Sequence, residues 1–121
     1  ALKVLQIPNL IILGHSNCGG VEYSYKTLLD KKNINDFEYI NQWTSCLQNS
    51  YNNIPNDLSE TEKITFFEQE NIKQSIKNLH EYDFIDKLIN ENKLNVIGLW
   101  YQINSGLIKF LDKNNSFIDL D

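Results

Sequence analysis

The segment that most constrains the fold is a short apolar run followed by a glycine-rich turn. Residues 10–13 are four consecutive apolar residues between Asn9 and Gly14. A run of this length bounded by turn residues is typical of a strand buried on both faces, as in a parallel sheet. Residues 21–29 then show the apolar spacing of an amphipathic helix. We therefore expect a strand, a tight turn and the start of a helix.

Two side chains with metal-binding chemistry lie in that turn. His15 and Cys18 are three positions apart, so an imidazole nitrogen and a thiolate can reach the same small cation. Zinc prefers this pair of ligands in tetrahedral geometry. The spacing alone is more often that of a packed thiol, and a zinc site needs at least three protein ligands. By itself, the turn predicts at most part of a metal site.

Three stretches of the chain carry a family resemblance. Residues 14–21, Gly-His-Ser-Asn-Cys-Gly-Gly-Val after an apolar strand, resemble the second zinc-ligand motif of the β-class carbonic anhydrases. Residues 68–79 and those that follow are similar to the family's helix pair, although Asp83 stands where a proline is usual. Residues 94–106 resemble the last parallel strand and its hairpin turn, with Ile97 in place of the common histidine.

The resemblance implies a fold, a cofactor and a reaction. It implies an α/β fold with a parallel-sheet core, helical crossovers and antiparallel edge strands at the C-terminus, a partial β-carbonic anhydrase fold. It further implies Zn²⁺ held by His15 and Cys18, with an acceptor holding the other ring nitrogen of the histidine. The reaction implied is the reversible hydration of CO2 to bicarbonate, in a homodimer or higher oligomer.

One part of the family pattern has no match in these residues. The family's sheet begins with an earlier strand that carries a Cys-x-Asp-Ser-Arg motif, which would supply another zinc ligand and an Asp–Arg pair. We therefore expect residues 1–121 to form a single domain that lacks its N-terminal part. Two alternatives stay open: a catalytically inactive remnant with a structural or interaction role, and a related hydrolase of CS2 or COS.

Composition excludes several other classes of function. The net charge is −5 and the chain has no arginine, so a nucleic-acid partner is not expected, because phosphate binding needs clustered basic residues. No apolar stretch approaches the roughly 18 residues needed to cross a bilayer, and no signal peptide opens the chain. The two cysteines cannot build a disulfide framework. We expect a soluble, cytoplasmic protein.

Helices are expected on both sides of the polar turn at residues 52–57. Residues 1–6 have the spacing of the last turns of a helix. Residues 35–51 predict one helix whose buried stripe contains Phe37, Ile40, Trp43 and Leu47. Ser59 and Glu62 form a capping-box pattern, which predicts the start of a long helix. Residues 83–91 predict a further short helix.

Strands are expected mainly in the last third of the chain. Residues 94–103 predict a second parallel strand, and residues 107–111 and 117–120 predict edge strands. Between residues 94–103 and 107–111, Asn-Ser-Gly at 104–106 predicts a turn in which Gly106 has a positive φ.

Four further side chains are candidates for a functional role. Cys46 is expected to be a packed core cysteine rather than a zinc ligand. His80 is expected to be a surface residue at the end of the long helix, where a cation favours the helix dipole. Glu68 and Glu70 cannot share a helix face, so we expect at least one of them to be solvated.

Overall fold

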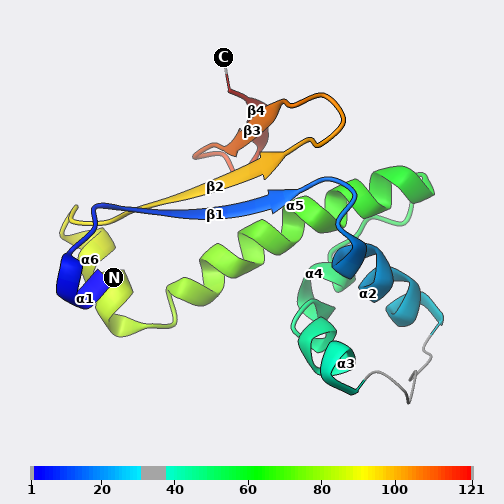
Figure 1. Cartoon of the computed structure of the whole chain (residues 1–121), viewed down its shortest axis with the longest axis horizontal. Coiled ribbons are helices and arrows are strands. Elements are labelled where there is room, and N and C mark those ends of the chain that lie inside the picture. Colours follow the sequence, from blue (N-terminus) through cyan, green and yellow to red (C-terminus); the bar gives the residue numbers. More distant parts are fainter. Residues whose placement is uncertain (1, 31–37, 121) are drawn as a thin grey trace.

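The computed structural model describes residues 2–30 and 38–120 and contains one four-stranded sheet with helices at both of its ends (Figure 1). The described elements, in chain order, are α1 (Leu2–Leu5), β1 (Asn9–His15), α2 (Gly19–Asp30), α3 (Glu38–Ser45), α4 (Gln48–Asn52), α5 (Glu60–Leu79), α6 (Asp83–Asn90), β2 (Asn95–Tyr101), β3 (Ile108–Leu111) and β4 (Phe117–Asp119).

The sheet combines one parallel and two antiparallel pairings in the order β1-β2-β3-β4. β1 and β2 are parallel, with Ile11 opposite Ile97 and His15 opposite Tyr101. β3 and β4 are added as an antiparallel hairpin beyond β2. Gly106, between β2 and β3, has φ of 74° as expected. The α/β class, the parallel core and the antiparallel C-terminal strands are therefore confirmed.

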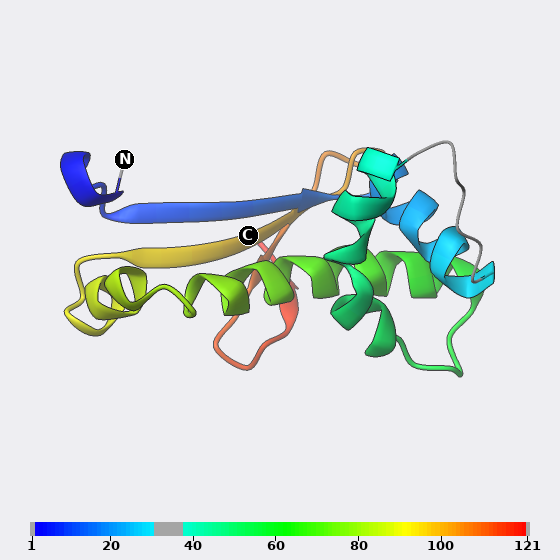
Figure 2. The same cartoon turned by 90° about the horizontal axis from the view of Figure 1, so that it is seen from below.

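α5 runs along one face of the strand pair, as both views show (Figures 1 and 2). Two glycines allow this close approach. A Cβ at Gly14 would lie 2.6 Å from Cδ1 of Ile72, and a Cβ at Gly98 would lie 3.0 Å from Cδ1 of Ile76. Because real Cβ atoms do not pack this tightly, glycine at both positions lets the helix lie directly on the sheet.

The opposite face of β1 is open, which corrects the expectation of a strand buried on both faces. The strand alternates between exposed and half-buried residues, and Ile11 and Leu13 are 54% and 62% exposed. β1 is an edge strand of the sheet, with β2 as its neighbour on one side. The apolar run was correctly identified as a strand, but its cover lies on one face alone in the part of the chain that the structure describes.

The main core lies where α2, α4 and α5 meet. Its buried members are Val21, Tyr25, Leu47 and Phe67, and Phe67 is completely buried. Tyr51 packs its ring against both aromatic members, at 5.9 Å from Tyr25 and 6.0 Å from Phe67 between ring centroids. This aromatic cluster fixes the helices beyond the carboxyl end of β1.

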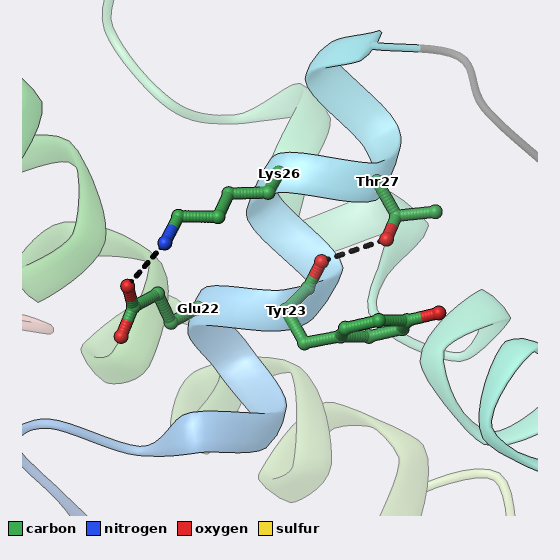
Figure 3. Close-up of polar contacts among 4 residues, drawn as sticks. All are labelled: Glu22, Tyr23, Lys26 and Thr27. Atoms are coloured by element: carbon green, nitrogen blue, oxygen red, sulfur yellow. Dashed lines mark hydrogen bonds and ion pairs between the residues drawn. The ribbon is translucent and has the colours of Figure 1, made fainter. Parts of the chain in front are cut away.

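The outer surface of α2 is held by short polar contacts (Figure 3). Glu22 and Lys26 form an ion pair one turn apart, and the Thr27 hydroxyl donates to the Tyr23 carbonyl at 2.8 Å. The Tyr23 hydroxyl also donates to Asn41 in α3 at 3.3 Å. The last contact ties α3 to α2.

The start of α5 is confirmed in detail, because Ser59 is its N-cap. The Ser59 hydroxyl accepts from the backbone of Glu62, and the Glu62 carboxylate accepts from the Ser59 backbone, which completes the capping box. None of the helices described is long and apolar enough to span a bilayer.

The predicted helix over residues 35–51 is wrong in its extent and in its buried stripe. It is two helices, α3 and α4, with a break at residues 46–47. Ile40 is exposed and Trp43 is 54% exposed, with its ring against the backbone of Gly20. Leu47 is buried as expected, while Phe37 lies outside the described residues. Cys46 falls in the break and is exposed, so it is not a core cysteine.

Candidate metal site

The turn that carries His15 and Cys18 joins the carboxyl end of β1 to the start of α2. Asn17 adopts a φ of 56°, a left-handed conformation that asparagine tolerates better than most residues. The Cys18 carbonyl accepts the first backbone hydrogen bond of the helix, from Glu22 at 2.9 Å. The two predicted donors therefore lie at a strand end beside a helix N-terminus, where α/β folds commonly bind ligands.

The orientation of the His15 ring suits a metal ligand. Its Nδ1 lies 2.9 Å from the Ser16 carbonyl oxygen. Because a carbonyl can only accept, this contact fits the neutral tautomer protonated on Nδ1, in which Nε2 keeps its lone pair for a metal. The Ser16 carbonyl thus provides the acceptor that was expected to hold the second ring nitrogen.

Ser16 fastens the turn to the end of β2 and to the segment that follows it. Its backbone N–H donates to the Tyr101 carbonyl at 2.9 Å, and its hydroxyl accepts from the Ile103 backbone at 2.9 Å. Ser16 is buried, although Ile103 is 48% exposed. The ring of His15 is therefore carried by a turn that is hydrogen-bonded on its sheet side.

Glu68 holds the same turn from the side of α5, a contact that the sequence did not predict. The side chain comes from α5 and the residue is 3% exposed. One carboxylate oxygen accepts from the Cys18 backbone at 3.2 Å, and the other accepts from the Trp100 indole at 3.3 Å. Burial raises the pKa of Glu68, while the hydrogen bonds from Cys18, Trp100 and Asn17 oppose that rise.

Glu70 is half-buried, so it keeps part of its contact with solvent, while Glu68 does not. The Glu70 side chain is 16% exposed, accepts from Asn53 at 2.9 Å and lies 3.5 Å from the Lys73 ammonium. No pattern on α5 marks Glu68 as special, because its partners come from residues 50 positions before it and 32 positions after it. The available signal was an acidic side chain in the part of α5 that faces the His15–Cys18 turn.

The described residues do not bring a third metal donor to the turn. No group of three or more His, Cys, Asp or Glu side chains suited to a metal ion occurs within residues 2–30 and 38–120. Cys46 is exposed between α3 and α4. His80 caps the far end of α5, where it contacts Asp86 at 2.9 Å, and the expectation of a surface cap is confirmed. The donor types at His15 and Cys18 suit zinc, and the set is incomplete.

Fold and turn together define an α/β protein with zinc-type donors at the carboxyl end of a parallel strand. The sequence model of the carbonic anhydrase family matches residues 1–108. The chain belongs to this family, and its relatives place it in the β class.

Relatives of known function are similar over most of this chain. It is 30% identical over 108 residues to β-carbonic anhydrase 3 of Arabidopsis thaliana, covering 87% of this chain and 42% of the relative. It is 29% identical over 114 residues to the carbonic anhydrase of Helicobacter pylori, covering 89% and 50%. The chain thus spans about half the length of these relatives.

Solved structures agree with this assignment. The β-carbonic anhydrase CcaA superposes with a TM-score of 0.79 at 25% identity, covering 99% of this chain and 59% of that one. One of two tetrameric β-carbonic anhydrases from Sordaria macrospora gives a TM-score of 0.75 at 26% identity, covering 91% and 55%. The likeness extends to the sheet and to the helices beyond its carboxyl end.

Proposed function

We propose that this protein takes part in the zinc-dependent, reversible hydration of CO2 to bicarbonate. The observation that carries the proposal is the His15 ring, held through Nδ1 so that Nε2 is free, three residues before Cys18 in a family member. His15 and Cys18 would hold the ion. Zinc bound there would act as a Lewis acid and lower the pKa of a bound water molecule to about 7.

We further propose that the remaining donors come from outside the described residues. A segment bearing the family's Cys-x-Asp-Ser-Arg motif is the expected source. The open edge of β1 supports this, because a parallel strand added there would end beside His15. Two protein donors leave an ion largely hydrated, so the chain by itself is expected to be catalytically silent.

The test is CO2 hydration by zinc-loaded protein, measured against a no-protein blank. The chain of residues 1–121 should give no turnover, and adding a polypeptide with the missing cysteine and aspartate should restore it. His15→Ala should then abolish the restored activity. His80→Ala is the matched control, because this second histidine lies at the far end of α5 and should leave the activity unchanged.

Two results would contradict the proposal. Turnover by residues 1–121 alone, lost on His15→Ala, would show that the chain contains a complete site. If the protein has neither activity nor bound zinc after the missing segment is added, the result would favour an inactive remnant. This is the second candidate because the donor set within the described residues is incomplete. Turnover of CS2 or COS in place of CO2 would favour the hydrolase alternative.

We also propose that the protein works as a homodimer or larger assembly. The support is the open apolar face around Ile11 and Leu13, together with the tetrameric state of the Sordaria macrospora relative. Light scattering at micromolar concentration tests this, and a monodisperse monomer would count against it.

A further inference from the structure

We propose that Glu68 is a positioning residue for the His15–Cys18 metal site, acting through the Cys18 backbone rather than as a ligand. The inference rests on the metal site proposed above and adds a residue to it. Glu68 joins three elements, since its own helix α5 is linked by its carboxylate to the turn before α2 and to β2.

The location of the carboxylate follows from the packing of α5 on β1. One helical turn after Glu68, Ile72 lies against Gly14, directly before His15. Trp100 is paired with Gly14 in the sheet and is buried, so its indole N–H reaches the same carboxylate. Glu68 therefore lies between the turn and β2 and accepts hydrogen bonds from both.

The burial of this carboxylate needs a reason. No lysine forms an ion pair with Glu68 in the part of the chain that the structure describes. A buried carboxylate without such a partner costs folding free energy, because water solvates the charge better than the protein interior. Its hydrogen bond to Cys18 holds the backbone from which the thiol projects.

A glutamine cannot replace this arrangement. A carboxylate accepts through both oxygens, so it satisfies the Cys18 N–H and the Trp100 indole N–H at once. An amide has one accepting oxygen, and its NH2 group would face one of these two donors. Glu68→Gln should therefore release either the turn or the indole, although the two side chains have nearly the same shape.

The experiment is a titration of residues 1–121 with Co²⁺, followed by the thiolate-to-cobalt absorption in the near ultraviolet. Glu68→Gln should weaken Co²⁺ binding by about 10–100-fold, the usual effect of losing a group that orients a ligand. Glu70→Gln is the matched control, because Glu70 lies on the same helix and is also hydrogen-bonded, but to Asn53. It should bind Co²⁺ as the wild type does.

A double variant separates positioning from charge. Trp100→Phe removes the second donor, so in Glu68→Gln with Trp100→Phe the amide oxygen is free to accept from Cys18. Affinity should return towards the wild-type value. Failure of this rescue, with both proteins folded by circular dichroism, would assign the effect to lost charge and overturn the positioning role, as would unchanged affinity in Glu68→Gln.

A measurement without any variant covers the case in which Glu68→Gln does not fold. The Cys18 amide proton of the wild-type chain should exchange slowly with solvent, because it is bonded to a buried carboxylate, and fast exchange would overturn the proposal. A failure of the proposed metal site itself would give a different result. The wild-type protein would show no thiolate-to-cobalt absorption, or the same absorption would remain after His15→Ala.

Discussion

Adding one methyl group at Gly14 tests how closely α5 lies on the sheet. The new Cβ would lie 2.6 Å from Cδ1 and 2.8 Å from Cγ1 of Ile72, a buried residue of α5. Comfortable carbon contacts are about 3.5–4.0 Å, so the overlap is about 1 Å. Overpacking of this kind costs about 1–3 kcal/mol, while replacing a strand glycine by alanine otherwise gains about 0.5–1 kcal/mol.

We therefore expect Gly14→Ala to lower the free energy of unfolding by about 1–2 kcal/mol, measured by urea denaturation. Gly19→Ala is the control, because no heavy atom lies within 4 Å of a Cβ there. Ile72→Ala removes both clashing atoms, so Gly14→Ala with Ile72→Ala should cost less than the sum of the single variants. Strict additivity, or a Gly14→Ala protein as stable as the wild type, would refute the close approach.

Two further perturbations test the core and the cap. Phe67→Ala should cost about 3–5 kcal/mol, because it empties the centre of the aromatic cluster, and urea denaturation would show it. Ser59→Ala should cost about 1 kcal/mol at neutral pH through loss of the capping box. The Ser59 hydroxyl and backbone hold the pKa of Glu62 below its ordinary value of 4.5. The part of this stabilisation that comes from the ionised Glu62 is present above pH 4.5 and is lost as the pH falls through the lowered value, so the difference in thermal unfolding between Ser59→Ala and wild type should narrow in acid.

Features that depend on a few neighbouring residues were predictable from the sequence. The capping box at Ser59 and the positive φ at Gly106 are local, because each is decided within one turn of the chain. β2 and the strands of the C-terminal hairpin also follow from short-range patterning. The position of His15 and Cys18 in a strand-to-helix turn was predictable for the same reason.

Features that depend on tertiary neighbours were not predictable. Apolar residues at helical spacing cannot show that Trp43 lies on Gly20 rather than in the core, since the pattern contains no information on the partner. The same limit applies to Ile11, whose burial depends on what covers the sheet. The sequence could not show which of Glu68 and Glu70 is buried, because the hydrogen-bond donors to Glu68 are far away in the sequence.

No strand covers the outer edge of β1 in the part of the chain that the structure describes, and this has a consequence for handling the protein. Residues 9–15 contain no lysine, acidic side chain or proline, the residues that natural proteins use to prevent neighbouring molecules from adding strands. Residues 10–13 combine branched apolar side chains with zero charge, two of the properties of the longer segments that stack into cross-β fibres. At high concentration and without a partner, fibre growth from this edge would compete with the folded state, and a single lysine at an exposed position such as Leu13 would suppress it.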